Sequence, residues 1–289
     1  MTASAGNRIV YCQGRFLPLE EATIPIMDRG FLFGDGIYEV SAVIDGRLVD
    51  NAAHLARLER SLKAIAIPNP FSIAEWTALQ IELVARNGLS EGLVYLQVTR
   101  GVAERDFLSP PGLLPTVVMF TQAKTVLANP AFETGIGVIT VPDIRWYRRD
   151  VKSTALLAQV LAKQAAQAAG VAEAWMVEDH HVTEGASSTA FIVTHGRQIV
   201  TRPLSHAILP GITRQAVLNV AKSHGFDVAE RLFTVEEALH AEEAFITSAS
   251  ALAVPVVAIN GHRVGNGRPG PVVAALRAEY LDLVRAGAG

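Results

Sequence analysis

Cysteine is almost absent from this sequence of 289 residues, which contains only Cys12. A single cysteine cannot form an internal disulfide, and it excludes a zinc site built from several thiolates. The N-terminal residues contain no apolar stretch of the kind that a secretory signal needs, and no long uncharged apolar run occurs elsewhere. We therefore expect a protein of a reducing compartment, the cytoplasm, with no membrane as partner.

An excess of charge of one sign is also lacking. The 25 lysines and arginines nearly balance the 28 acidic residues, so the net charge is −3 and the pI is about 6.2. Nothing in this balance favours nucleic acid or an anionic membrane as a partner. Hydrophobic residues, in contrast, make up 50% of the chain. That share is sufficient for a large core, in one big domain or two modest ones.

Helix-like and strand-like patterns mix irregularly along the chain, with many hairpin turns between them. This mixture predicts an α+β or mixed α/β fold and not a regular parallel array of strands and helices. The pattern is weak at 123–135, which we interpret as an interdomain linker. The expected domains are a small N-terminal α/β domain at 1–122 and a larger C-terminal α/β domain at 136–289.

Lys152 lies in a basic stretch between a strand predicted at 135–141 and a helix predicted at 154–169. Ser153 or Thr154 is the expected N-cap, so the lysine amine would face the positive end of the helix dipole. Further positive charge is expected from Arg145, Arg148 and Arg149. Both effects favour the neutral amine that a nucleophilic lysine needs. The alternative interpretation is a basic surface loop.

Two further sequence patterns suggest binding sites at first sight. Gly34-Asp35-Gly36 fits neither the dinucleotide nor the P-loop pattern, and a turn before a strand explains it better. The run at 178–181 (Glu-Asp-His-His) contains metal-ligand residue types but falls between two strand-like segments. A solvated hairpin tip is expected there, and we predict no metal site.

The segment around Pro210 and Gly211 is a turn that leads directly into a helix. Such a turn leaves the first amides free, those of Ile212 and Thr213, and free helix-start amides can bind an anion. Ordinary capping explains the pattern equally well. The run at 247–250 offers hydroxyl groups for a second phosphate contact or, alternatively, forms a local turn.

Seven segments, taken together, resemble the fold-type IV pyridoxal-phosphate enzymes. That family includes branched-chain and D-amino-acid aminotransferases, (R)-selective amine transaminases and aminodeoxychorismate lyase. The matching segments are residues 28–30 with 33–40, 54–58, 97–101, 150–153, 183–188, 209–214 and 245–248. They occur in the family's order and span most of the chain, and the resemblance is strongest to the D-amino-acid aminotransferases. It implies an α+β, two-domain fold, with pyridoxal 5′-phosphate between the domains and the Schiff-base lysine in the C-terminal domain.

The resemblance also implies a role for each matching residue. Lys152 would be the Schiff-base lysine that also moves the substrate proton, and Glu184 would pair with the cofactor's pyridinium nitrogen. Tyr38 would complete the catalytic set beside the ring and the substrate. Leu209 would pack on the ring. The phosphate would be held by Arg57, Ile212, Thr213, Ser248 and the backbone of Ala249, which replaces a threonine frequent in the closest relatives.

The expected substrate residues are Tyr38, Arg105, Phe107, Ser187 and Ser188. The best-known D-amino-acid aminotransferases grip the substrate carboxylate with an Arg-x-His pair donated by the partner subunit. This chain has Arg105-Asp106-Phe107 at that place. The arginine can still bind a carboxylate in a bidentate manner, although Asp106 could neutralise it.

The resemblance therefore predicts a homodimeric transaminase that moves an amino group from a D-amino acid, such as D-alanine, to a 2-oxo acid, such as 2-oxoglutarate, by a ping-pong mechanism. The alternatives are an (R)-selective amine or branched-chain amino-acid transaminase, or an aminodeoxychorismate-type lyase. A non-enzymatic homologue is disfavoured because both Lys152 and Glu184 are present.

Overall fold

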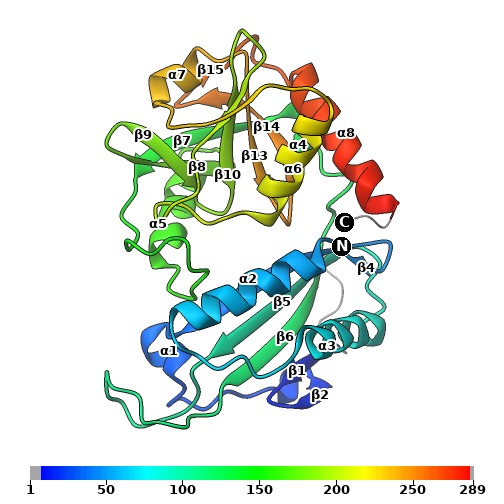
Figure 1. The fold of residues 1–289 in the computed structure, drawn as a ribbon, viewed down its shortest axis with the longest axis vertical. Coiled ribbons are helices and arrows are strands. Elements are labelled where there is room, and N and C mark those ends of the chain that lie inside the picture. The colour runs from blue at the N-terminus through cyan, green and yellow to red at the C-terminus, as the bar shows by residue number, and fades with distance from the viewer. Residues whose placement is uncertain (1–7, 287–289) are drawn as a thin grey trace. The chain divides into compact units, whose positions relative to one another are not determined.

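The computed structural model describes residues 8–286, and the chain divides into two compact units. Unit 1 comprises the residues up to Val126 together with Val151–Ala155, and unit 2 comprises Leu127–Asp150 and the residues from Leu156 onward. Both units combine helices with a sheet (Figure 1). None of the helices within residues 8–286 is long and apolar enough to cross a membrane.

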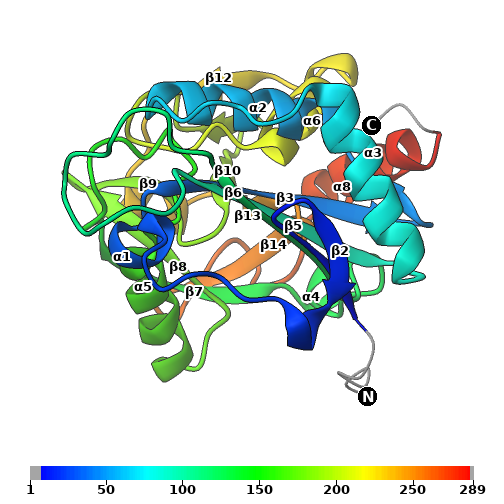
Figure 2. The same cartoon turned by 90° about the horizontal axis from the view of Figure 1, so that it is seen from below.

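Unit 1 contains an antiparallel sheet whose strands follow the order β2-β1-β6-β5-β3-β4. The strands are β1 (Ile9–Cys12), β2 (Arg15–Pro18), β3 (Gly36–Ile44), β4 (Arg47–Leu48), β5 (Gly92–Thr99) and β6 (Thr116–Ala123). The helices are the 3-10 turn η1 (Leu19–Glu21), α1 (Arg29–Phe33), α2 (Asn51–Ala64) and α3 (Ile73–Arg86). Figure 2 shows α2 and α3 in a view turned by 90° from that of Figure 1.

The core of unit 1 follows from two periodicities. Leu55, Leu58 and Leu62 recur at helical spacing on α2 and are buried against Trp76 of α3. Every second residue of β5, beginning with Val94, is buried in the same core. The residues between them point to the opposite face of the sheet, and that face carries part of the candidate site.

Unit 2 contains a mixed sheet in the order β12-β11-β10-β13-β14-β7-β8-β9, with β15 beside β14. Its strands are β7 (Ile136–Pro142), β8 (Glu173–Glu178), β9 (His181–Gly185), β10 (Thr189–Val193), β11 (Ile199–Thr201), β12 (Val228–Glu230), β13 (Glu243–Ser248), β14 (Leu252–Ile259) and β15 (His262–Arg263). Its helices are α4 (Ala131–Thr134), α5 (Leu157–Ala168), α6 (Ile212–Ser223), α7 (Val235–Leu239) and α8 (Pro271–Arg285). α6 and α8 pack together against β13 and β14, and α5 packs against β7 and β8 (Figure 1).

The segment before α5 differs from the sequence expectation. The helix begins at Leu157 with Leu156 as N-cap, so the prediction of Ser153 or Thr154 as the cap is wrong. Thr154 instead donates its hydroxyl to the carbonyl oxygens of Gly34 and Gly36, at 3.0 and 3.3 Å. Tertiary hydrogen bonds thus hold this segment extended, and the helix starts where they end.

The same hydrogen bonds explain why Val151–Ala155 group with unit 1, although the chain on both sides lies in unit 2. The amide of Tyr38 donates to the carbonyl of Lys152 at 3.0 Å, and Ser153 forms an isolated bridge with Ile37. The segment therefore lies along β3. The expected domain boundaries had placed the lysine in the C-terminal domain.

Candidate active site

Lys152 projects over an aromatic side chain of unit 1. Its Nζ lies 4.1 Å from the centre of the Tyr38 ring, within the range of a cation–π contact. Tyr38 stacks on Tyr95, and Tyr95 stacks on Phe120, so that β3, β5 and β6 contribute one ring each. Burial raises the pKa of the Tyr95 hydroxyl, which donates to Gln97. Lys152 therefore packs on one end of a row of stacked aromatic rings, which is a mostly apolar surface.

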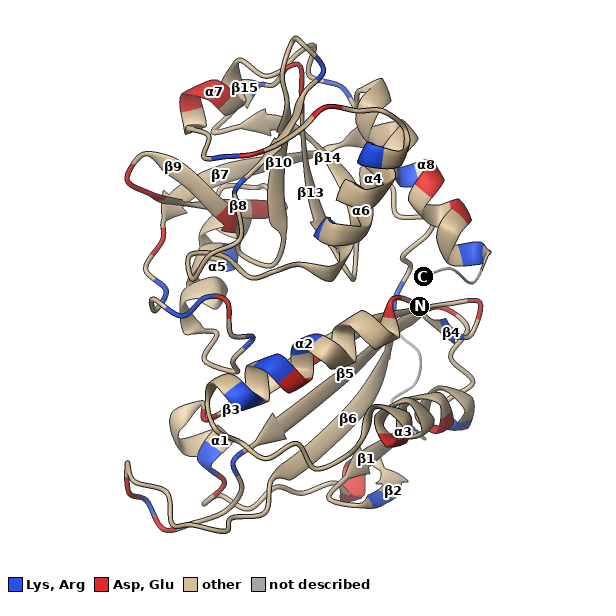
Figure 3. Ribbon diagram, viewed as in Figure 1, with Lys and Arg blue, Asp and Glu red and all other residues tan. Residues whose placement is uncertain are grey.

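The three arginines near Lys152 in sequence are each paired with an acid. Arg145 binds Asp143 at 2.7 Å, Arg148 binds Asp150 at 2.9 Å and Arg149 binds Glu178 at 2.8 Å. Both basic and acidic residues occur along the chain between β7 and α5, as Figure 3 shows. The expected excess of positive charge is thus largely cancelled, because the sequence prediction counted the arginines without their partners.

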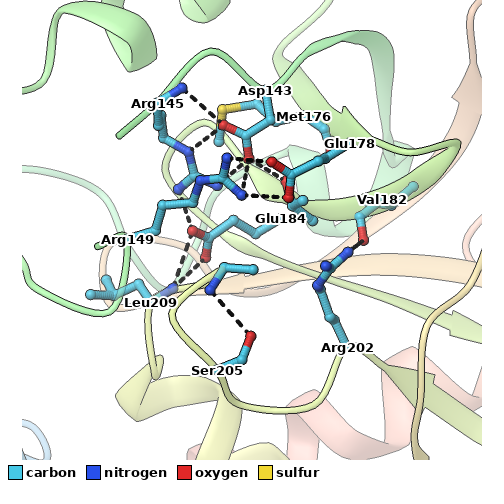
Figure 4. A network of polar contacts seen from close by, with 12 residues as sticks. Asp143, Arg145, Arg149, Met176, Glu178, Val182, Glu184, Arg202, Ser205 and Leu209 are labelled. Carbon is cyan, nitrogen blue, oxygen red and sulfur yellow. Dashed lines mark hydrogen bonds and ion pairs between the residues drawn. The ribbon is translucent and has the colours of Figure 1, made fainter. Parts of the chain in front are cut away.

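Glu184 lies near the end of β9 and is only 4% exposed. The backbone amide of Leu209 donates to both of its carboxylate oxygens at 3.2 Å, and Arg145 donates from Nη1 (Figure 4). Burial raises the pKa of Glu184, and the Arg145 guanidinium opposes that shift. The carboxylate of Glu184 is therefore buried and held in one position by Arg145 and the Leu209 amide.

Arg145 is itself held by Asp143, whose side chain is fully buried. Asp143 also accepts a hydrogen bond from the Thr183 hydroxyl at 2.7 Å. Burial alone would raise the pKa of Asp143, but Arg145 and Thr183 lower it overall, so this acid is charged at neutral pH. Sequence reasoning missed Asp143, although its position two residues before Arg145 is a local signal for the pair.

The start of α6 presents the anion-binding geometry that was one of two interpretations of the sequence. Gly211 is the N-cap and has no side chain, so the first amides of the helix, at Ile212 and Thr213, receive no side-chain cap. A Cβ on Gly211 would lie 2.9 Å from the Thr189 hydroxyl. The lack of a side chain at Gly211 therefore leaves the first amides of α6 accessible, and the helix dipole favours negative charge there.

The end of β13 meets the start of α6 through Thr189. Thr189 of β10 pairs with Thr247 of β13, while its hydroxyl faces Gly211. Thr247 Oγ1 is buried and has no hydrogen-bond partner within residues 8–286. Ser248 follows it, with its hydroxyl 3.4 Å from that of Ser250. The structure thus gathers the predicted residues of both segments at one place in unit 2.

Three other predicted residues have strong local partners. Arg57 on α2 is buried and donates from Nε and Nη2 to the two carboxylate oxygens of Glu39, each at 2.7 Å. Burial of Glu39 is outweighed by Arg57, so the pKa of Glu39 lies well below its ordinary value. Ser187 and Ser188 both donate their hydroxyls to the buried Glu173, at 3.1 and 3.2 Å. These serines can therefore offer backbone amides, but not hydroxyl protons, to another group.

Arg105 lies on an exposed loop of unit 1. Its guanidinium is 5.5 Å from the centre of the Phe33 ring and 5.9 Å from that of Phe107. Asp106 accepts from the amide of Leu108 at 3.0 Å, and no ion pair between Arg105 and Asp106 occurs in the described part of the chain. The two aromatic rings contact the Arg105 guanidinium, and Asp106 does not neutralise its charge.

Known proteins resemble this chain over most of its length. Residues 36–259 match the family model described as amino-transferase class IV. The chain belongs to the class IV aminotransferases. It is 41% identical to the D-alanine aminotransferase of Bacillus licheniformis, over 95% of this chain and 96% of that protein. It is 38% identical to the D-alanine aminotransferase of Listeria monocytogenes serotype 4b (strain F2365), over 92% of each.

Solved structures agree with this assignment. The branched-chain aminotransferase of Thermoproteus uzoniensis with norvaline superposes with a TM-score of 0.85 at 27% identity, over 97% of this chain and 96% of that one. The branched-chain enzyme of Escherichia coli shares the fold, with a TM-score of 0.87 at 23% identity over 96% and 94%. The predicted family and the α+β, fold-type IV architecture are confirmed.

This aminotransferase uses pyridoxal 5′-phosphate, as class IV aminotransferases do, and a further branched-chain relative of the same fold is solved with pyridoxamine 5′-phosphate. Its residues fit that group in three respects. The uncapped amides of α6 suit a phosphate, the buried Glu184 suits a cationic ring nitrogen, and the half-buried Lys152 supplies a primary amine. The buried hydroxyl of Thr247 is a further polar group near the start of α6, because its strand partner Thr189 faces Gly211.

Proposed function

We propose that this aminotransferase transfers the amino group of a D-amino acid, D-alanine in particular, to a 2-oxo acid such as 2-oxoglutarate by a ping-pong route. The observation that carries the proposal is the near full-length similarity to enzymes named D-alanine aminotransferase, at 41% and 38% identity. We further propose a homodimer in the cytoplasm. The exposed apolar side chains of the Arg105 loop support the dimer, since Phe107, Leu108 and Leu114 are 80%, 82% and 84% exposed.

The cofactor, when bound, supplies an aldehyde that condenses with amines and a ring that withdraws electrons. Lys152 would anchor it through its amine and would then carry a proton to and from the substrate α-carbon. The Tyr38 ring limits where that amine can move, because it lies directly beneath Nζ. Tyr38 would also form one wall of the substrate pocket.

Glu184 would accept a hydrogen bond from the ring nitrogen and keep a proton on it. Its negative charge is suited to this task because Arg145 and the Leu209 amide fix the buried carboxylate. Asp143 supports the arrangement by balancing the charge of Arg145. Leu209 would cover the ring with its side chain, since its own amide is tied to Glu184.

The phosphate would be held by the amides of Ile212 and Thr213, with the hydroxyls of Thr213 and Ser248 and the amide of Ala249. Arg57 would add a positive charge that Glu39 holds in one orientation. Ser187 and Ser188 would contribute backbone amides on the substrate side, because Glu173 accepts both hydroxyl protons.

Arg105 would bind the substrate carboxylate of the partner subunit's site. Phe107, which replaces the histidine of the best-known relatives, would support Arg105 through ring contact. Replacing Arg105 by methionine is expected to raise KM for D-alanine by about 10- to 100-fold, the effect of losing one charge-assisted hydrogen-bonded pair. Initial rates at varied D-alanine give the KM. An Arg197→Met variant, altered at an exposed turn of unit 2, is the matched control. An unchanged KM in Arg105→Met would remove Arg105 from this role.

A donor panel tests the proposed function. With 2-oxoglutarate present, D-alanine should yield pyruvate, while L-leucine and (R)-1-phenylethylamine should give little product. Turnover of (R)-1-phenylethylamine without turnover of D-alanine would assign the enzyme to the (R)-amine transaminases instead. Turnover of L-leucine alone would assign it to the branched-chain enzymes. Pyruvate formed from aminodeoxychorismate without any 2-oxo acid would indicate a lyase.

A further inference from the structure

Arg29 is a buried arginine that the proposed chemistry leaves without a role. It is the first residue of α1 and is 5% exposed. Its Nη1 donates to the carbonyl oxygen of Asp106 at 2.6 Å and its Nη2 donates to that of Phe107 at 3.1 Å. Its Nε pairs with Asp35 at 2.9 Å. One planar guanidinium therefore joins the two residues that follow Arg105 to an acid of the protein body.

Asp35 connects Arg29 to a second arginine. Arg100 donates to Asp35 from Nε at 2.8 Å and from Nη2 at 3.0 Å. Arg100 also donates to the carbonyl oxygens of Ile65 and Ala66, which follow α2. Although burial opposes ionisation, the two arginines lower the pKa of Asp35 overall. Asp35 is thus a charged link between α1, the end of β5 and the residues after α2.

The backbone that carries Arg29 is held closely against β5. Asp28 caps α1 by accepting from the amide of Gly30 at 2.8 Å, and it accepts from the Thr99 hydroxyl at 3.0 Å. A Cβ on Gly30 would overlap the side chain of Thr99, so only glycine permits this contact. These interactions account for the Asp28-Arg29-Gly30 motif. The backbone of Arg29 is therefore held in one position, and its guanidinium can fix the position of the loop that carries Arg105.

The loop depends on this attachment because its own residues are exposed. The two ends of the loop, Gly101 and Leu114, lie in contact. The φ angle of Gly101 is +108°, and a Cβ there would overlap the carbonyl oxygen of Leu114. Between these ends, Arg105, Phe107 and Leu108 are exposed. A loop with little buried surface is mobile unless specific bonds hold it.

We propose that Arg29 is a positioning residue that sets substrate affinity by fixing the Asp106 and Phe107 carbonyls, and through them the guanidinium of Arg105. This inference rests on the proposed role of Arg105 as the carboxylate anchor. Fixing the arginine before the substrate arrives reduces the ordering cost of binding, so Arg29 acts on KM more than on kcat.

The test compares Arg29→Lys with Arg277→Lys in the holoenzyme. A lysine keeps the charge, but its single ammonium cannot reach both carbonyls and Asp35 in the fork geometry of arginine. Arg277 is a matched control, because it also donates to a carbonyl, that of Leu127. It lies over the ring of Phe132, just as Arg29 lies over that of Phe33. We expect Arg29→Lys to raise KM for D-alanine about tenfold with kcat within about twofold, and Arg277→Lys to change neither.

Trypsin cleavage after Arg105 provides a second readout that does not depend on the substrate. We expect Arg29→Lys to accelerate this cleavage about tenfold, with cleavage after Arg197 in the turn between β10 and β11 as the internal reference. Asp35→Asn keeps both carbonyl bonds but loses the ion pair, so about a threefold rise in both readouts is expected. This variant decides the question if Arg29→Lys does not fold.

A rise in both KM and cleavage upholds the proposal, and a wild-type value of either one overturns it. If the wild-type enzyme itself does not use D-alanine, the proposed function fails. The cleavage ratio alone then decides whether Arg29 holds the loop.

Discussion

Replacing Lys152 by alanine is expected to lower kcat with D-alanine by at least about 10,000-fold, because the variant loses both the amine that anchors the cofactor and the group that moves the substrate proton. The binding residues of α6 and β13 remain in this variant, so the cofactor should still be retained by its phosphate. Steady-state rates and the absorbance spectrum of the bound cofactor measure the two effects separately.

The control for this variant is Lys63→Ala, since Lys63 is an exposed lysine near the end of α2. It should have wild-type rates and a wild-type spectrum. If Lys152→Ala kept a kcat within about tenfold of the wild-type value, another residue would have to perform the proton transfer, and the proposed role of Lys152 would be abandoned.

Replacing Glu184 by glutamine is expected to lower kcat by about 100- to 1,000-fold while leaving the cofactor bound, because an amide cannot keep a proton on the ring nitrogen. The variant should also change the pH dependence. Burial raises the pKa of Glu184, so in the wild-type enzyme the carboxylate is lost as the pH falls through a value above that of an exposed glutamate. That acid limb of the kcat profile should be absent from Glu184→Gln.

Glu243→Gln is the matched control for Glu184→Gln. Glu243 is also buried and also accepts from backbone amides, those of Val272 and Val273 at the start of α8, each at 2.9 Å. This control should lower the melting temperature but leave kcat and its pH profile unchanged. If Glu184→Gln retained both the wild-type rate and the acid limb, the acid limb would reflect the protonation of another group. Glu184 would then not have the proposed role.

Much of the fold was predictable because it rests on local patterns. Leu55, Leu58 and Leu62 recur at a spacing that is typical of an amphipathic helix, and α2 buries those side chains. The pairing of Gly211 with a following helix indicated free amides, and α6 begins there without a side-chain cap. The run at 178–181 was expected at a hairpin tip, and Asp179 and His180 form the turn between β8 and β9 with positive φ angles.

The predictions that were wrong concern contacts between residues far apart in the sequence. Thr154 was expected to cap α5, but its hydroxyl finds carbonyls of residues 34 and 36 instead. The arginines near Lys152 were counted as free charge, yet Arg149 pairs with Glu178 on a neighbouring strand. Local propensity is weaker than a tertiary hydrogen bond in an extended segment, and the sequence pattern contains no information on which acid a basic side chain meets.

The sequence by itself determined the family, the α+β class and the set of candidate residues, because each depends on residue identity and order along the chain. Only the tertiary structure decided how those residues are held. It tied Glu184 to Arg145 and the Leu209 amide, directed the Ser187 and Ser188 hydroxyls to Glu173, and joined Arg29 to the loop of Arg105. The physical reason is that these bonds depend on strand register and loop path, which bring together groups that are between 14 and 77 residues apart in the sequence.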